Sequence, residues 1–440
     1  MDAPTRREAV ALFGSTLLAG CSGSLPFTGE DDGPELDGAA LRAVVDGDAP
    51  AYPKRLPVGI EASHLDASET RARDLLGSAP ARFGRDEIPN GAIRAKMQDA
   101  RDRTESDLSR AGESRTAFER LDALADARAD ARFVAGAWRA IDADLTRADL
   151  ADEATDARRA LDALRERWAY VGGDPVDATL VAAAVEERLD AGHRAAADAV
   201  HGHRRYETGN PLGVGEAGES VERARTARSD AAYLSDRWRG SLDDPADRRS
   251  QLVAAHRTLA ADLRAELSDL SDVDRDRPWA GLDGVDEDSL TAWALQELYR
   301  WVGPRRADRF DEVDEEALAR SLLSMHETFA SLWAFESVRE SVADGEPYAV
   351  TSADDVAALR SAAVEALRTA DDETTAPALT RRRLSSLADR MRFADDRLSE
   401  EDGSVEVTWV RRELATYVEV AAAARATPRA SERVAAALRA

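Results

Sequence analysis

Histidine is the residue type in this chain that could most readily bind a metal ion or act as a general base, and it occurs only six times. Three histidines follow an acidic residue by three positions, in the pairs Glu61/His64, Asp190/His193 and Asp198/His201. On a helix this spacing places both side chains on one face, and ferritin-like bundles hold two metals with two Glu-x-x-His pairs and two further glutamates. Only the first pair contains glutamate, and acids are so frequent (85 of 440 residues) that such pairs arise by chance. We therefore predict no metal site and no cofactor.

The other motifs that could carry chemistry are weaker. Gly209-Asn-Pro-Leu-Gly213-Val-Gly215 has the glycines of a phosphate-binding loop, but it lacks the flanking strand and the Lys-Ser/Thr pair, so we interpret it as a connector between helices. Neither a Gly-x-Ser-x-Gly elbow nor a His-Glu-x-x-His motif occurs. The single cysteine, Cys21, excludes a multi-thiolate zinc site within one chain. We predict no catalytic residue; whether the protein is an enzyme stays open, with a non-enzymatic role favoured.

The charge balance indicates the environment of the protein. Asp and Glu outnumber Lys and Arg by 85 to 59, which gives a net charge of −26, and all basic residues except Lys54 and Lys96 are arginine. Such a composition resembles that of proteins from salt-loving archaea, in which dense carboxylates hold water and cations at molar salt. A codon bias toward Arg, Ala and Asp explains part of it. No basic stripe stands out, so we do not expect binding to nucleic acid.

The first 21 residues have the three parts of an export signal: the basic pair Arg6-Arg7, an apolar run over residues 9–20, and small residues before a cleavage point. The paired arginines resemble a twin-arginine signal, and Leu18-Ala19-Gly20-Cys21 resembles the lipobox of haloarchaeal exported lipoproteins. Glu8 and Ala9 depart from the more typical twin-arginine pattern, so the Sec route stays open. The resemblance covers residues 1–21 only.

The lipobox resemblance implies that residues 1–20 are removed and that Cys21 carries a lipid. We therefore expect the protein outside the cell, attached to the outer face of the cytoplasmic membrane through the lipid on Cys21. No later segment has the ~20 mostly apolar residues that a spanning helix needs. A single lipid chain gives only marginal binding, so firm retention requires a double-chain anchor or a partner.

The pattern after the signal predicts an all-α protein. Hydrophobic residues make up 43% of the chain, many of them alanine, and aromatic residues only 5%, which favours close-packed helices. Leu318, Leu322, Met325, Phe329 and Leu332 recur at spacings of 4, 3, 4 and 3, as in the seam of a helical bundle. We predict about ten to twelve antiparallel amphipathic helices in one elongated or two adjoining bundles.

The chain divides into a flexible tether (21–48), a Pro-rich extended strap (49–65), a helical bundle (66–208), a Gly-rich joint (207–218) and a second bundle (219–440). Asp174-Pro175 and Asp244-Pro245 each place a capping acid before a proline that suits the first position of a helix. The segment from Val405 to Trp409 alternates like a strand, but it continues at helical spacing, so we expect helix there. Of the eight tryptophans, we expect Trp279 to be exposed in a loop and the others, Trp409 included, to lie mainly in the core.

These features favour a surface-anchored lipoprotein of unknown molecular function, most simply a non-enzymatic helical binding or scaffold protein. One alternative is a helical-bundle enzyme or metal carrier that uses His193, His201 and nearby carboxylates. Another is an accessory subunit of a membrane transport or sensor complex. A protein partner of unknown identity remains open in each case.

Overall fold

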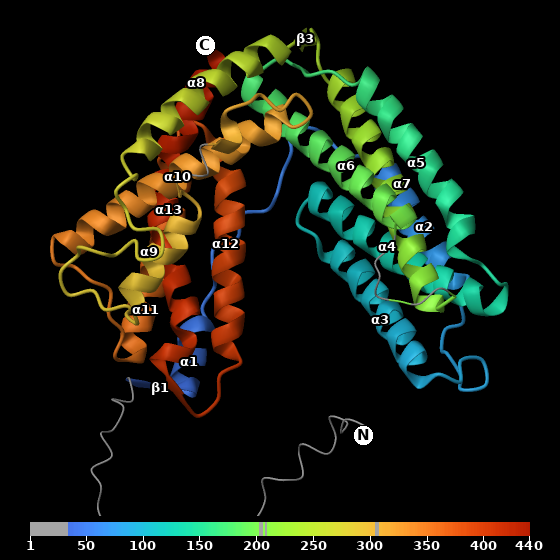
Figure 1. Cartoon of the computed structure of the whole chain (residues 1–440), viewed down its shortest axis with the longest axis horizontal. Helices are drawn as coiled ribbons and strands as arrows, with labels where there is room; N and C mark the ends of the chain where they lie inside the picture. The colour runs from blue at the N-terminus through green and yellow to red at the C-terminus, as the bar shows by residue number, and fades with distance from the viewer. Residues whose placement is uncertain (1–33, 202–205, 207–208, 304–307) are drawn as a thin grey trace, which may run out of the picture.

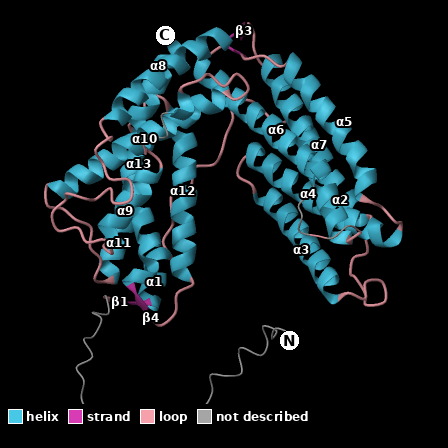
Figure 2. Ribbon diagram, in the orientation of Figure 1, coloured by secondary structure: helices cyan, strands magenta, loops and turns pink. Residues whose placement is uncertain are grey.

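The computed structural model describes residues 34–201, 206, 209–303 and 308–440 and confirms the all-α prediction. In these residues thirteen α-helices account for nearly all regular structure, and the four strands have two or three residues each (Figure 2). The helices form two bodies, each around its own hydrophobic clusters.

The N-terminal body consists of six helices that follow one another in the chain. They are α2 (Ala62–Gly77), α3 (Gly91–Glu113), α4 (Ala117–Asp142), α5 (Arg147–Arg167), α6 (Pro175–His201) and α7 (Pro211–Gly240). Local sequence signals start several of them: Thr146 and Asp149 form a capping box at α5, and the Asp174 carboxylate accepts a hydrogen bond from the Val176 amide at 2.8 Å at the start of α6. The predicted helix start at Asp174-Pro175 is confirmed.

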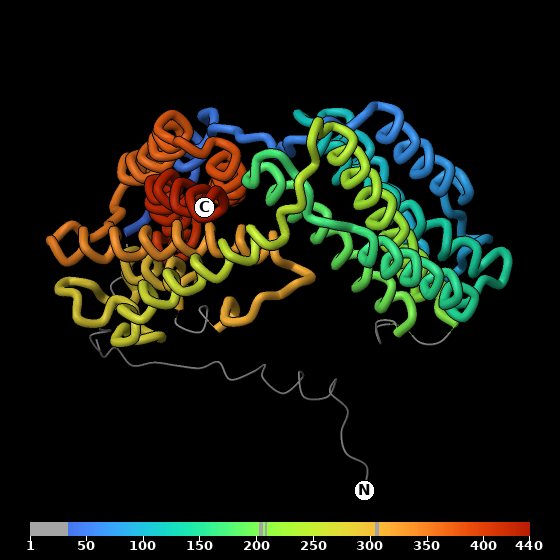
Figure 3. Tube along the Cα trace, turned by 90° about the horizontal axis from the view of Figure 1, so that it is seen from above, coloured from blue at the N-terminus to red at the C-terminus, as the bar shows by residue number. Residues whose placement is uncertain are grey.

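The C-terminal body is built around its last helix. It contains α1 (Gly38–Val45), α8 (Arg249–Ser268), α9 (Leu290–Arg300), α10 (Leu318–Ala343), α11 (Ala353–Asp372), α12 (Pro377–Ser399) and α13 (Val407–Arg439). Seen from above, α13 runs through the middle of this body (Figure 3), and it contacts each of α8 to α12. Its alanines from Ala421 to Ala424 are all buried, because small side chains let neighbouring helices approach a central helix from several sides.

Two pairs of short strands join distant parts of the chain. β1 (Glu35–Asp37) pairs antiparallel with β4 (Ser404–Glu406), and β2 (Val171–Gly172) pairs antiparallel with β3 (Ala246–Asp247). The prediction of a tether over residues 21–48 is therefore wrong from Pro34 onward. There β1 and α1 are folded, because Leu36 and Leu41 are buried in the C-terminal core.

The predicted Gly-rich joint at residues 207–218 is also misplaced. Residues 211–218 are the first turns of α7, where a Cβ on Gly215 would lie only 2.9 Å from the carbonyl oxygen of Phe133 on α4. Gly215, together with Gly218 beside Arg132, therefore allows close packing between α4 and α7. The two bodies separate instead after α7, where β3 rather than a helix follows Asp244-Pro245 and α8 begins only at Arg249.

The two bodies meet at one end and diverge toward the other, so the molecule has the shape of an arch (Figure 1). β3, paired with β2, lies where the bodies meet (Figure 1), and β1 and β4 lie together at the free end of the C-terminal body (Figure 2). Within the described part of the chain, no helix has both the length and the hydropathy needed to cross a membrane.

Candidate functional site at the joint between the two bodies

Helix α6 belongs to both hydrophobic cores. Val176 and Leu180 lie in the cluster of the C-terminal body, whereas Val181, Val185 and Leu189 lie in a cluster of the N-terminal body. Trp168, just before α6, packs against both clusters. The bodies are therefore connected by continuous apolar packing rather than by a hinge of loops.

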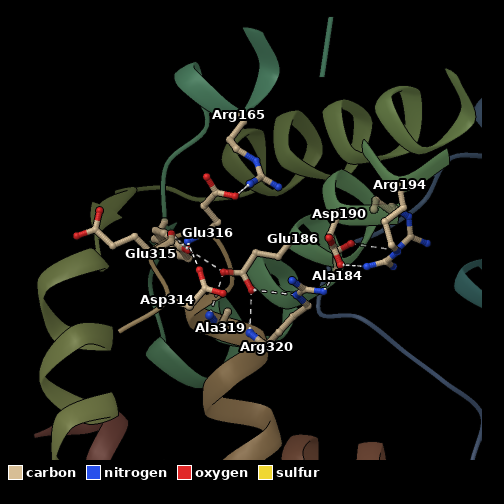
Figure 4. Close-up of polar contacts among 12 residues, drawn as sticks. Arg165, Ala184, Glu186, Asp190, Arg194, Asp314, Glu315, Glu316, Ala319 and Arg320 are labelled. Atoms are coloured by element: carbon tan, nitrogen blue, oxygen red, sulfur yellow. Dashed lines mark hydrogen bonds and ion pairs between the residues drawn. The ribbon is translucent and has the colours of Figure 1, made fainter. Parts of the chain in front are cut away.

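The buried carboxylate of Glu186 lies between α6 and the start of α10, among the polar contacts of the joint (Figure 4). Its side chain is 0% exposed and reaches from α6 to the first turn of α10. One oxygen, Oε1, accepts hydrogen bonds from the Ala319 amide at 2.9 Å and the Tyr170 hydroxyl at 2.7 Å, and Oε2 accepts one from the Arg320 amide at 2.8 Å. Residue Ala317, at the N-cap position of α10, has no side chain able to cap the helix, so Glu186 supplies the cap from the other body.

Burial and hydrogen bonding act in opposite directions on this carboxyl. Burial raises the pKa of Glu186, and its hydrogen bonds to Tyr170, Ala319 and Arg320 lower it without cancelling the effect of burial. Burial next to Glu186 also raises the pKa of Tyr170, which therefore keeps its proton and donates it in the hydrogen bond. All three donors are consumed in holding α6, α10 and the segment before β2 together.

Ion pairs surround the buried carboxylate at the rim of the joint. Arg320 on α10 pairs with Asp190 on α6 at 2.8 Å, and Arg165 on α5 pairs with Glu316 just before α10 (Figure 4). These pairs cross between the bodies but are partly exposed to solvent, so each contributes little stability by itself. The ion pairs orient the two bodies relative to each other, while the apolar packing and Glu186 hold the bodies together.

Arg248 donates further hydrogen bonds across the joint. The Arg248 amide, after β3, donates to the Tyr170 carbonyl at 2.8 Å, and its guanidinium donates to the Gly172 carbonyl at 3.0 Å. Of the predicted strap (49–65), residues 49–61 form neither helix nor strand and run between the bodies, whereas residues 62–65 begin α2, so the prediction is wrong there. Tyr52 donates to the Leu367 carbonyl of α11, whereas the Lys54 amide donates to Glu119 of α4. The joint is thus fixed on several sides.

The structure does not bring the acid-spaced histidines together. His64 lies 2.9 Å from Asp230 and stacks on Tyr233, while His193 lies 3.7 Å from Asp162 and His201 is exposed. His203 lies outside the described residues. Among the residues that are described, no group of three or more His, Cys, Asp or Glu side chains gathers in a way that could hold a metal ion.

His326 and Ser431 form a hydroxyl–imidazole pair of the kind that nucleophilic catalysis uses. The His326 Nε2 lies 2.9 Å from the Ser431 Oγ, which accepts a hydrogen bond from Thr380 at 2.8 Å. However, both His326 and Ser431 are 0% exposed, so no substrate reaches them in this conformation. We interpret the chain of hydroxyls as a polar contact between α10, α12 and α13. Complete burial lowers the pKa of His326 from 6.5 to about 3.

This burial predicts an acid-sensitive contribution to stability. Below its unfolded-state pKa of 6.5, His326 takes up a proton only when the protein unfolds, so the free energy of unfolding falls as the pH drops from 6.5 toward about 3. The expected slope from this residue is ~1.4 kcal/mol per pH unit. Denaturant unfolding at several pH values, at constant high salt, should show this extra slope in the wild type and not in His326→Gln. Equal slopes in the two proteins would contradict the assignment.

The structure also changes the assignment of the exposed tryptophan. Trp279 is half-buried and packs against the C-terminal core, so the expectation that it is exposed was wrong. Trp409, expected in the core, is 77% exposed. It lies in the first turn of α13, directly after β4, so the expectation of helix from Val405 was wrong for Val405 and right from Val407.

The export and lipidation residues Arg6, Arg7, Leu18-Ala19-Gly20 and Cys21 lie outside the described residues. The residues of the joint, in contrast, gave no signal in the sequence. Glu186 is one of 85 acids, and its partners Ala319 and Arg320 are more than 130 positions away. Only the lack of a capping residue at the start of α10 could have indicated that a cap comes from elsewhere.

Comparisons with known proteins divide the chain at the same joint. Residues 63–244 match the model of a Domain of unknown function (DUF8262), and residues 249–436 match that of a second Domain of unknown function (DUF8264). No curated protein and no solved structure matches the chain. The two matched stretches correspond to the helices α2–α7 and α8–α13, and the short gap between them contains β3. The chain is therefore similar to two successive domains of unknown function that meet at the joint around Glu186.

Proposed function

We propose that the protein is an exported, lipid-anchored helical scaffold or binding protein, which presents an arch of two joined bodies outside the cytoplasmic membrane. The structural observation that carries this proposal is the position of β1 at the free end of the C-terminal body. Pro34 leads into β1 at the free end of the C-terminal body, opposite the joint. Only thirteen positions separate Pro34 from Cys21, so a lipid on Cys21 would hold this end near the membrane and the joint away from it.

The construction of the joint supports a scaffold role. Shared apolar packing on α6, a fully buried carboxylate and the hydrogen bonds donated by Arg248 favour movement of the two bodies as one unit. A rigid arch can present two surfaces at a fixed separation. The buried polar groups of the joint are occupied in holding helices together and do not face a substrate.

The charge balance supports the proposed environment. A net charge of −26 with almost no lysine suits a protein exposed to molar salt, where the Debye length is only about 3 Å and carboxylates repel each other weakly. A twin-arginine route would fit such a protein, because proteins that use it are exported already folded.

The anchor is tested by Cys21→Ser, which removes the only thiol that could carry the lipid. We expect the variant in the medium, or as an uncut precursor that retains residues 1–20, whereas the wild type stays with the membrane fraction. Cell fractionation followed by immunoblotting distinguishes these results. Ser22→Ala, which keeps the lipobox cysteine, is the matched control and should be retained like the wild type. Unchanged membrane retention of Cys21→Ser would contradict the anchor.

A metal-dependent enzyme would be the clearest competing function. Elemental analysis of the mature protein, purified at high salt, distinguishes it from a scaffold. A stoichiometric metal together with a metal-dependent activity would overturn the non-enzymatic proposal.

A further inference from the structure

Trp409 is the most exposed large hydrophobic side chain in the described part of the chain, with 77% of its surface accessible. Its neighbour Val410 is 2% exposed and points into the C-terminal core, so the exposure of Trp409 is not due to fraying of the helix. No hydrogen bond or ring contact involves the indole within the described residues. An exposed tryptophan of this kind is a frequent anchor in contacts, since its ring is apolar and its N–H still needs a polar partner.

The position of Trp409 connects it with the proposed anchor. The Val407 amide, two residues before Trp409, donates a hydrogen bond to the Pro34 carbonyl at 3.0 Å. Trp409 therefore lies within about 10 Å of the point from which the chain leads back to Cys21, given the short rise of a helix. A segment of thirteen residues spans at most about 45 Å when fully extended. A lipid on Cys21 would therefore keep Trp409 within about 55 Å of the bilayer, the sum of these two distances.

We propose that Trp409 is a second membrane contact, which inserts into the interfacial region of the lipid bilayer beside the lipid on Cys21. This inference rests on the proposed lipid anchor. Tryptophan is enriched at the boundary between headgroups and acyl chains, where its ring is buried and its N–H is hydrated. A single lipid chain binds only marginally, and stable anchoring takes a second signal. Because the anchor already holds the protein at the surface, the second contact forms at high effective concentration.

The charges around Trp409 determine the conditions for this contact. Arg412, one turn further along α13, is exposed and makes no ion pair with any residue described. The loop between α12 and β4 carries Glu400, Glu401 and Asp402, which oppose approach to an anionic surface. Molar salt screens this repulsion but does not weaken burial of an indole. The contact is therefore apolar, and it persists at high salt where an electrostatic contact would be lost.

The contact is tested with the mature lipid-bearing protein reconstituted into vesicles of zwitterionic phosphatidylcholine brominated on its acyl chains, at molar salt. Bromine quenches tryptophans that enter the bilayer. We expect a quenched component in the wild type that disappears in Trp409→Phe. Trp301→Phe changes the other exposed tryptophan, 38% accessible and lying at the end of α9 beside Arg390, and should keep the quenched component. Equal quenching in wild type and Trp409→Phe would overturn the contact.

A second measurement gives the size of the effect. Transfer of the lipidated protein from labelled to unlabelled vesicles should be about tenfold faster for Trp409→Ser than for the wild type. A tenfold change corresponds to a modest loss of the free energy of membrane binding. Phe393→Ser, at an aromatic side chain of α12 that is 62% exposed, is the control and should transfer at the wild-type rate. Equal transfer rates for Trp409→Ser and Phe393→Ser would contradict the proposal, as would a dimer in solution that Trp409→Ser dissociates.

The measurements distinguish a failure of the proposed lipid anchor on Cys21 from a failure of the proposed Trp409 contact. Mass analysis of the same samples reports the lipid on Cys21 independently of the fluorescence. A lipidated protein with unquenched Trp409 overturns the second contact alone. A protein without lipid on Cys21 overturns the anchor and, with it, the contact that depends on it.

Discussion

Replacing Glu186 with alanine is expected to lower the free energy of unfolding by about 3–5 kcal/mol, the usual cost of removing one partner from a buried charged network. The substitution leaves the Ala319 and Arg320 amides without an acceptor inside the joint, and it leaves the Tyr170 hydroxyl with only the Glu315 carbonyl at 3.2 Å. It also removes the cap from the first turn of α10. Because the same carboxylate connects α6 to α10, we expect the two bodies to unfold in separate steps in the variant.

A graded series tests the role of the carboxylate. Glu186→Gln should lose about 1–3 kcal/mol, because one amide oxygen can still accept from Tyr170 and Ala319 while its NH2 group faces the Arg320 amide. Glu187→Ala is the matched control: it lies on the same helix, is exposed, and should change stability by no more than about 0.5 kcal/mol. Denaturant unfolding at high salt, followed by circular dichroism, measures all three. A loss in Glu186→Ala no larger than that in Glu187→Ala would contradict the role of the joint.

Removing salt is expected to unfold the protein. The net charge of −26 makes the compact state repel itself, and the distance over which carboxylates interact grows from about 3 Å at 1 M salt to about 30 Å at 0.01 M. Buried pairs such as Arg128 with Glu222 are shielded from this change, but most surface acids are not. The thermal midpoint should therefore fall steeply as salt is diluted.

Thermal melts across a dilution series, followed by circular dichroism, measure this effect. Returning the sample to about 1 M salt should restore the helical signal, which shows that screening rather than aggregation governs the change. A thermal midpoint that stays constant across the series would show that the acidic composition is not an adaptation to salt.

The sequence predicted the helices well, because the information that sets them is local. The seam Leu318, Leu322, Met325, Phe329 and Leu332 is buried throughout α10, as its 4-3-4-3 spacing indicated. Where a prediction depended on tertiary contacts, it was less accurate. The glycines of residues 209–218 are typical of a loop, yet Gly215 and Gly218 lie in α7, where they approach α4 closely.

The joint could not be predicted from the sequence for the same reason. The choice of Glu186 among many surface acids depends on the approach of α10 from the other body, and nothing within α6 records it. β1 and β4 illustrate a similar limit, since each strand has three residues and gains its structure only by pairing with a segment more than 360 positions away. Trp409 was misassigned because it falls near the period of the apolar stripe, whereas Val407 and Val410 are the residues of the same turn of α13 that pack against the core.

Mass spectrometry of the N-terminal peptide, from protein purified with its native membrane, tests the lipid anchor on Cys21 most directly. We expect the peptide to begin at Cys21, with a lipid attached to the sulfur through a thioether bond. A peptide that begins at Met1 with an unmodified cysteine would contradict the anchor, the orientation of the arch and the membrane contact of Trp409 together.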